Sequence, residues 1–147
     1  SGSVIRHGAY IRGNVIIGND CVVGHASEVK SSVFLNGAKA AHFAYVGDCI
    51  LGNGVNLGAG TKLANLKVMS TSVKVKINDR SIDTKLRKFG AIIGDNSETG
   101  CNSVTAPGTL IGKNSIIYPT LFVRGFIPQN SIVKQKNFEY AIYVKKE

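Results

Sequence analysis

The most constraining feature of the sequence is a mostly aliphatic position that recurs every six residues. In the first half of the chain its members are Ile5, Ile11, Ile17, Val23, Val29, Phe34, Ala40, Val46, Leu51, Leu57 and Leu63, with a five-residue step at two places. In the second half they are Ile93, Thr99, Thr105, Ile111, Ile117 and Val123. A repeat of this length predicts a solenoid of short stacked strands rather than a layered fold.

The composition fits a narrow solenoid. Among 147 residues, 17 are glycine and only 7% are aromatic, with no tryptophan. Glycine allows sharp turns, and a thin core needs few large side chains. We expect one all-β domain over residues 1–147, a parallel β-helix of hexapeptide repeats in which three units close each triangular coil. Its coils should cover residues 4–66 and 91–128.

Residues 67–90 break the six-residue spacing. Apolar and basic residues alternate in Val73, Lys74, Val75, Lys76 and Ile77. This alternation, followed by a turn at Asn78 and Asp79, predicts a hairpin that leaves the coil. The repeat fades after Pro128, so residues 129–147 are expected to form a C-terminal cap.

The net charge of +9 at pH 7 favours an anionic partner without specifying it. Basic residues concentrate only at 67–90, without the interleaved aromatic residues that nucleic-acid binding requires, and no apolar run is long enough to span a membrane. We therefore expect a small-molecule ligand and neither a nucleic-acid nor a membrane partner. Three cysteines, an odd number without a CxxC motif, predict a reduced, cytoplasmic protein.

Stacking of the coils places residues three units apart above one another, about 4.8 Å per coil. Tyr10, Glu28 and Tyr45 then share one outward column, and Arg12 and Lys30 share the next. Two stacked cations repel unless an anion joins them, which favours a phosphate clamp. The alternative is ordinary ion pairing with Glu28.

All three histidines fall in one corner column. His7, His25 and His42 each follow their repeat position by two residues, and Ala59 comes next above them. A zinc site is the alternative to a single reactive histidine, but metal ligands must converge on one point, whereas this column spans about two coil rises. His42 stands beside the glycine-rich turn 57–60, whose N–H groups could meet an oxyanion.

The stretch Gly24–Thr61 closely resembles the acetyltransferase domain of the bifunctional glucosamine-1-phosphate N-acetyltransferase/uridyltransferase family. The later part of the chain is more similar to C-terminal domains of archaeal-type sugar-1-phosphate nucleotidyltransferases. The first resemblance rests on E-V-K at 28–30, K-A-x-H-x-x-Y-x-G-D at 39–48 and V-N-L-G-A-G-T at 55–61, and the second on 90–95 and 123–125.

The resemblance implies a left-handed β-helix that forms a homotrimer and transfers acetyl from acetyl-CoA to the amine of glucosamine-1-phosphate, without a metal. It makes His42 the general base and places Ala59 and Cys101 near acetyl-CoA. The groups it implies around the sugar phosphate are Arg12, Lys30, Tyr45, Asn56 and Glu28.

Two departures from the family keep a second hypothesis open. Ala41 replaces the family's glycine before the histidine, and the segment 62–67 followed by the excursion replaces the family's own sequence after the G-A-G-T motif. The alternative is a non-catalytic domain for trimerisation and sugar-phosphate binding, attached to a nucleotidyltransferase. The sequence does not distinguish glucosamine- from galactosamine-1-phosphate, and the chain is expected to be the C-terminal half of a longer enzyme.

Overall fold

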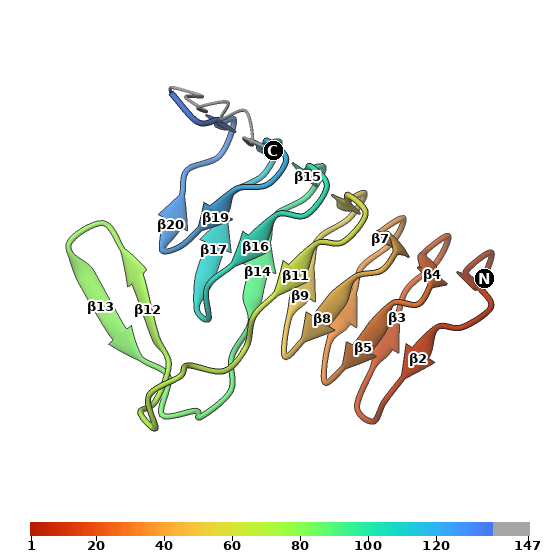
Figure 1. Ribbon diagram of the computed structural model, residues 1–147, viewed down its shortest axis with the longest axis horizontal. Coiled ribbons are helices and arrows are strands. Elements are labelled where there is room, and N and C mark those ends of the chain that lie inside the picture. The colour runs from red at the N-terminus through yellow and green to blue at the C-terminus, as the bar shows by residue number, and fades with distance from the viewer. Residues whose placement is uncertain (137–147) are drawn as a thin grey trace, which may run out of the picture.

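The computed structural model, which describes residues 1–136, is an all-β solenoid of short parallel strands (Figure 1). Three parallel sheets form its sides, and we name them A, B and C in the order in which the chain visits them. Sheet A consists of β1 (Val4–Ile5), β4 (Val22–His25), β7 (Lys39–His42), β10 (Asn56–Leu57), β15 (Glu98–Thr99), β18 (Ile116–Ile117) and β21 (Ile132–Val133).

The other two sides have six strands each. Sheet B consists of β2 (Tyr10–Ile11), β5 (Glu28–Lys30), β8 (Tyr45–Gly47), β11 (Lys62–Leu63), β16 (Val104–Thr105) and β19 (Phe122–Val123). Sheet C consists of β3 (Ile16–Ile17), β6 (Val33–Phe34), β9 (Ile50–Leu51), β14 (Ala91–Ile93), β17 (Thr109–Ile111) and β20 (Phe126–Ile127).

The strand register confirms the six-residue repeat. In sheet B, Ile11 pairs with Val29 and Val29 pairs with Val46, so every repeat position lies directly over the one three units earlier. Side chains alternate along a strand, so the repeat positions point inward and their neighbours point outward. The predicted left-handed parallel β-helix is confirmed.

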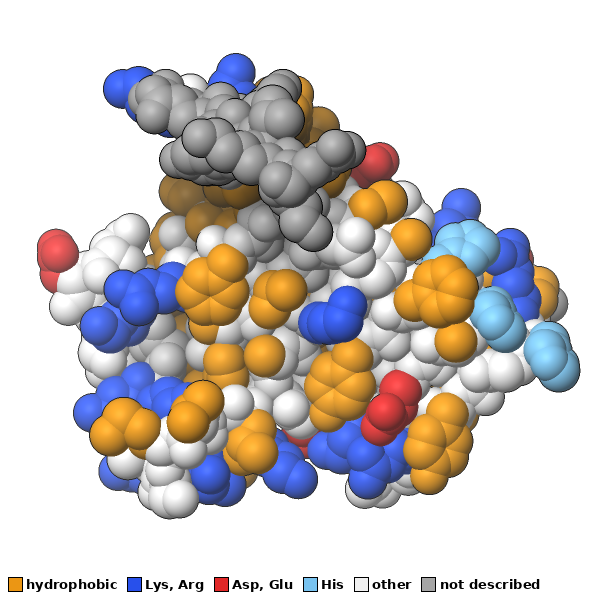
Figure 2. Space-filling view, in the orientation of Figure 1, with side chains coloured by type: hydrophobic (Ala, Val, Ile, Leu, Met, Phe, Trp, Pro, Cys, Tyr) orange, Lys and Arg blue, Asp and Glu red, His pale blue; other side chains and the backbone are white. Residues whose placement is uncertain are grey.

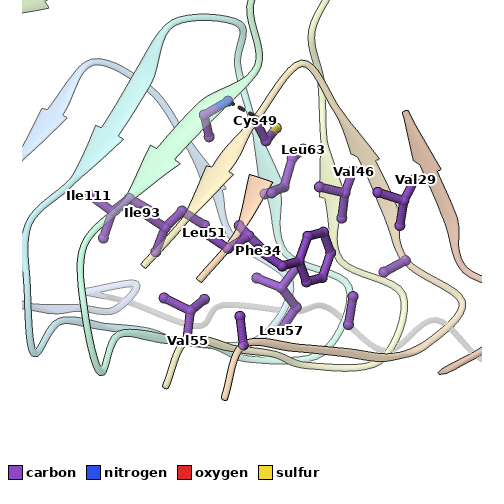
Figure 3. Packing of buried hydrophobic residues seen from close by; sticks show 14 of the residues in the cluster. Val29, Phe34, Val46, Cys49, Leu51, Val55, Leu57, Leu63, Ile93 and Ile111 are labelled. Atoms are coloured by element: carbon purple, nitrogen blue, oxygen red, sulfur yellow. Dashed lines mark hydrogen bonds between the residues drawn. The ribbon is translucent and has the colours of Figure 1, made fainter. Parts of the chain in front are cut away.

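The core is a set of stacked aliphatic side chains inside the three sheets (Figure 3). Val29, Val46, Leu51 and Leu63 are fully buried. Phe34 is the only aromatic side chain in the buried core of residues 1–136, and it too has no exposed surface. One large ring in a narrow aliphatic interior explains why the chain needs so few aromatic residues.

The corners between the sheets are tight turns that use left-handed backbone conformations. At the turn from sheet A to sheet B, which we call the A–B corner, the left-handed positions are Gly8, Ala26, Phe43, Gly60, Asn102 and Thr120. A bulky residue such as Phe43, at φ 50°, is uncommon in this region of backbone space, and such strain often accompanies function.

The excursion is confirmed as a hairpin at the turn from sheet B to sheet C, the B–C corner. Strands β12 (Lys74–Ile77) and β13 (Arg80–Asp83) pair antiparallel across the expected turn. The chain returns to the place it left, because Phe89 N–H donates to the Asn65 carbonyl at 2.9 Å.

The regular coil extends beyond Pro128, where the sequence repeat fades. Strand β21 pairs in parallel with β18, so sheet A continues to Val133. Residues 137–147 of the expected cap lie outside the described residues. Within residues 1–136 the structure has no helix of a length and hydropathy suited to crossing a membrane.

Replacing the one core ring should destabilise the solenoid strongly. We expect Phe34→Ala to lower the free energy of unfolding by about 3–5 kcal/mol, since it removes buried area and leaves a cavity between coils. Phe122→Ala, whose side chain is 64% exposed on sheet B, should change it by less than about 0.5 kcal/mol. Urea unfolding followed by circular dichroism measures both, and equal losses in the two variants would contradict the packing described.

Candidate functional site

The outer face of sheet B carries the polar column expected from the repeat. Tyr10, Glu28, Tyr45 and Lys62 follow one another in register. A groove of about 440 Å³ opens over this face; it is lined by Ala26, Glu28, Phe43, Ala44, Tyr45, Lys62, Ala64, Asn65 and Leu66. We call it the sheet B groove. It has both apolar walls and a few polar groups, as small-molecule sites do.

Arg12 is paired with Glu28 at the N-terminal end of this groove. Its Nη1 donates to Glu28 Oε1 at 2.9 Å, and both side chains are more than one third exposed. The hydrogen bond to Glu28 raises the pKa of Arg12, which therefore stays charged. Arg12 thus forms the ion pair with Glu28, and its remaining N–H donors stay free of that contact.

Lys30 is held more tightly, by a carboxylate that the sequence did not assign to it. Lys30 Nζ donates to Asp48 Oδ2 at 2.9 Å, and only 13% of the lysine side chain is exposed. Asn65 Nδ2 also donates to Asp48, and Tyr45 OH donates to Asn65 Oδ1 at 3.4 Å. The chain of contacts links Lys30 to Tyr45.

Gly47 makes this network possible. A Cβ there would lie 2.7 Å from both Tyr45 Oη and Asn65 Nδ2, which is closer than real contacts allow. Asp48 and Asn65 thus join Lys30 and Tyr45 in one network of contacts, which sequence reasoning did not predict. The sequence did contain one indication for Asp48, because Gly47 and Asp48 are the last two residues of the motif at 39–48.

The three histidines form a column along the A–B corner (Figure 2). The His7 and His25 rings stack at 6.0 Å, and His25 Nδ1 is 2.9 Å from the His7 carbonyl oxygen. Phe43 packs edge-on against His25 and also lines the sheet B groove. His42 is exposed at the same corner, and the neighbouring Phe43 separates its ring from the sheet B groove.

Above His42 the corner is built from small side chains. Gly60 N–H donates to the His42 carbonyl at 3.0 Å, and Asn102 N–H donates to the Ala59 carbonyl at 2.8 Å. No backbone carbonyl of residues 1–136 accepts a hydrogen bond from the Ala59 N–H, so that donor is available to a ligand. Cys101 is exposed directly above Ala59.

A second opening continues this corner column toward the C-terminal coils. Pro119 follows Cys101 in register, and it lines a groove of about 440 Å³ together with Tyr118, Thr120, Leu121, Lys134 and Gln135. His42, Ala59, Cys101 and this opening therefore lie along a single edge of the solenoid.

Asn56 lies on another side of the molecule. Its side chain belongs to the outer column of sheet A, between Lys39 and Glu98, and is half-buried there. The structure therefore separates Asn56 from the sheet B groove by the A–B corner. It also places Arg12 and Lys30 beside that groove rather than in its lining.

The histidine column does not form a metal centre in the described part of the chain. Among residues 1–136 no three His, Cys, Asp or Glu side chains converge on a point suited to a metal ion. The two imidazoles that approach each other, those of His7 and His25, stack face to face instead.

The sequence matches the family described as the GMPPB C-terminal domain over residues 1–83. It is 40% identical over 129 residues to the bifunctional protein GlmU of Methanococcus vannielii, covering 88% of this chain and 31% of that protein. It is 41% identical over 111 residues to the bifunctional sugar-1-phosphate nucleotidylyltransferase/acetyltransferase of Sulfurisphaera tokodaii, covering 76% and 28%. The chain spans about a third of the length of these relatives.

Solved structures share the solenoid at low sequence identity. PerB from Caulobacter crescentus, in complex with CoA and GDP-perosamine, superposes with a TM-score of 0.70 at 20% identity, covering 88% of this chain and 52% of that one. The acetyltransferase domain of PglB from Neisseria gonorrhoeae, in complex with acetyl coenzyme A, gives 0.68 at 21% identity, covering 86% and 51%. These likenesses establish the fold.

Thiol reactivity should report the corner geometry. Burial raises the pKa of Cys49 to about 12, so this thiol stays protonated at pH 8, and Cys21 is also buried. We expect Ellman's reagent to modify Cys101 rapidly in the folded protein and all three thiols after unfolding. The Cys101→Ser variant should lose the rapid phase, and rapid labelling of a second thiol in that variant would contradict the burial described.

Proposed function

The chain belongs to the family of the GMPPB C-terminal domain, and we propose that it is an acetyltransferase domain acting on an amino-sugar 1-phosphate, with acetyl-CoA as co-substrate. The observation that carries the proposal is the convergence of the three matched motifs. The first two place Lys30 and Tyr45 on sheet B and His42 at the A–B corner, and the third places Ala59 in register with His42. A relative that is 41% identical to this chain over 111 residues is named as a bifunctional sugar-1-phosphate nucleotidylyltransferase/acetyltransferase.

We propose that the sugar phosphate binds beside the sheet B groove, at Arg12 and Lys30. Each cation already has one carboxylate partner, so the phosphate must use their remaining donors. A guanidinium has five N–H donors and an ammonium has three, and one of each is used by Glu28 and Asp48. Ion pairs that hold both cations in place reduce the entropy lost when the phosphate binds.

Tyr45 and Glu28 are proposed to contact the sugar. Both line the groove, and their side chains are neighbours in one column. Asn56 lies on sheet A, away from the sheet B groove, and is therefore proposed to contact a sugar bound in the site of a neighbouring subunit of the trimer.

We propose that His42 is the general base. The amine of the sugar attacks the thioester carbonyl, a C–N bond forms, and His42 takes the proton that the nitrogen loses. The Ala59 N–H is proposed to stabilise the oxyanion. When the C–S bond breaks, the imidazolium returns its proton to the departing thiolate, so the reaction is balanced without a metal or redox partner.

The residues along the A–B corner suit acetyl-CoA, which supplies the acetyl group as an activated thioester. Small side chains at Ala59 and Cys101 leave room beside His42, and the groove at Pro119 continues along the same edge. We propose that the carrier portion follows this edge toward the C-terminal coils. The three unpaired thiols support a reduced, cytoplasmic setting.

We propose that the domain works as a homotrimer, and the outer column of sheet C is the surface that supports this. Every member of the column is apolar: Ile16, Val33, Ile50, Ile92, Leu110 and Phe126. The outer columns of sheets A and B contain charged residues, whereas sheet C has none. A continuous apolar stripe on one face marks an interaction surface.

Removal of the base tests the assignment. We expect His42→Ala to lower kcat for thiol release by roughly 10²–10⁴-fold with the fold retained, because proton transfer from the amine is then unassisted. His7→Ala, from the same column, should retain normal turnover. Assays with glucosamine- and galactosamine-1-phosphate identify the preferred sugar. Near-normal turnover by His42→Ala would overturn the assignment, and sugar-phosphate binding without thiol release by the unaltered protein would favour the non-catalytic alternative.

The apolar column makes a separate prediction about assembly. A lysine at position 50 would place a charge in the centre of the proposed interface, so Ile50→Lys should shift the protein from trimer to monomer. The matched control is Ile116→Lys on sheet A, where the isoleucine is 43% exposed against 41% for Ile50. Sedimentation equilibrium distinguishes the states, and a trimer that survives Ile50→Lys would rule out sheet C as the interface.

A further inference from the structure

A second polar groove lies between the hairpin and the B–C corner, away from the histidine column. It has a volume of about 370 Å³ and is lined by Lys67, Lys74, Lys76, Ala106, Pro107, Gly108, Arg124 and Gly125. Four of these eight residues are cations and none is acidic. Figure 2 shows the gathering of Lys and Arg side chains over the hairpin region at the lower left.

The cations come from segments that pack closely against the solenoid. Lys74 and Lys76 alternate with Val73 and Val75, whose side chains are buried, so both lysines lie on the other face of β12. A Cβ on Gly108 would lie 2.7 Å from the Lys74 carbonyl oxygen, which shows how closely the hairpin packs on the corner.

The hairpin is also tied at its base. Val73 N–H donates to the Leu86 carbonyl at 2.8 Å, and Thr84 donates twice to the Val73 carbonyl. Lys67 Nζ donates to the Ser72 carbonyl at 2.6 Å, which orients this lysine as well. The groove is therefore a formed feature of the fold and needs no closure to bring its charges together.

No carboxylate neutralises these charges in the described part of the chain. The ion pairs among residues 1–136 involve Arg12, Lys30, Lys85 and Lys113, and none of the four cations of this groove. Asp83 stands opposite Lys74 in the hairpin but is engaged elsewhere: Ser72 and then Lys85 bond to it and lower the pKa of Asp83 to about 2. None of the four cations of the groove therefore has an ion-pair partner among residues 1–136.

We propose that this groove binds a pyrophosphate group, as carried by a nucleoside diphosphate or by coenzyme A. Two adjacent phosphates match four cations better than a single phosphate does. Arg124 provides a planar fork for bidentate contact with phosphate oxygens, and the lysines supply point charges. Gly125, with φ 77° and open space on its Cβ side, lets a ligand approach the backbone beside that arginine.

The site lies apart from the residues proposed for acetyl transfer. It lies at the B–C corner, whereas His42, Ala59 and Cys101 follow the A–B corner. Binding of pyrophosphate can therefore be measured whether or not the protein transfers acetyl groups.

Titration calorimetry of the whole chain with inorganic pyrophosphate tests the proposal. We expect saturable binding that weakens as salt is raised, and a loss of at least about tenfold in affinity in the Lys74→Gln, Lys76→Gln double variant. The control carries Arg80→Gln and Lys113→Gln, which remove the same charge outside the groove. No binding, or an equal loss in both double variants, would overturn the proposal, because a diffuse basic surface would explain either result.

Competition identifies the source of the pyrophosphate group. If coenzyme A displaces pyrophosphate, the groove holds the phosphates of the co-substrate; this outcome rests on the proposed acetyl transfer and then also predicts a raised KM for acetyl-CoA in the Lys74→Gln, Lys76→Gln variant. If uridine or guanosine diphosphate displaces it and the KM is unchanged, the groove is a separate nucleotide site. Both outcomes support the site, and failure of all three to compete for it would overturn the assigned ligand class.

Discussion

The backbone ladder between successive coils is the constraint on which the rest of the molecule depends. Each short strand pairs in parallel with the strand one coil above and one coil below, so the register of the first coils is carried to every later one. A slip of one residue would exchange the inward and outward sets of side chains. The aliphatic columns prevent this, because only one register buries them. The columns of the candidate site, Glu28 under Tyr45 and His25 under His42, are consequences of that register.

The excursion shows how the solenoid accepts an insertion without losing this register. The chain leaves after β11 and returns at Gly90, whose N–H donates to the Asp48 carbonyl at 2.8 Å. Ala91 N–H then donates to Cys49 Sγ at 3.2 Å, so a buried thiol marks the point where the coil resumes. Asn65, at the beginning of the excursion, bonds to Asp48. The same corner thus closes the insertion and positions Lys30, which ties the packing of the hairpin to the geometry of the sheet B groove.

The repeat in the sequence was enough to predict which side chains stack in columns. Neighbours in a column are fixed by counting residues, so the Tyr10, Glu28 and Tyr45 column and the three stacked histidines follow from the spacing alone. Contacts across a corner do not follow from the spacing of the repeat. The partner of Lys30 depends on the path of the chain at Asp48 and on the return of the excursion. The same holds for the groove at the hairpin, since its lysines and Arg124 are 48 or more residues apart in sequence and meet only because β12 packs on Gly108.

The distribution of charge separates the two grooves physically. Beside the sheet B groove, Arg12 and Lys30 are each paired with a carboxylate. The local positive charge is therefore largely neutralised, and only the unused N–H donors remain for a ligand. At the hairpin, Lys67, Lys74, Lys76 and Arg124 have no such partner among residues 1–136. Four of the basic residues behind the net charge of +9 therefore line the groove at the B–C corner, away from the histidines. Unpaired cations in a concave surface focus the field and raise the local concentration of anions. The groove at the hairpin therefore attracts anions by charge, whereas Arg12 and Lys30 can contact an anion only through the donors that their carboxylate partners leave free.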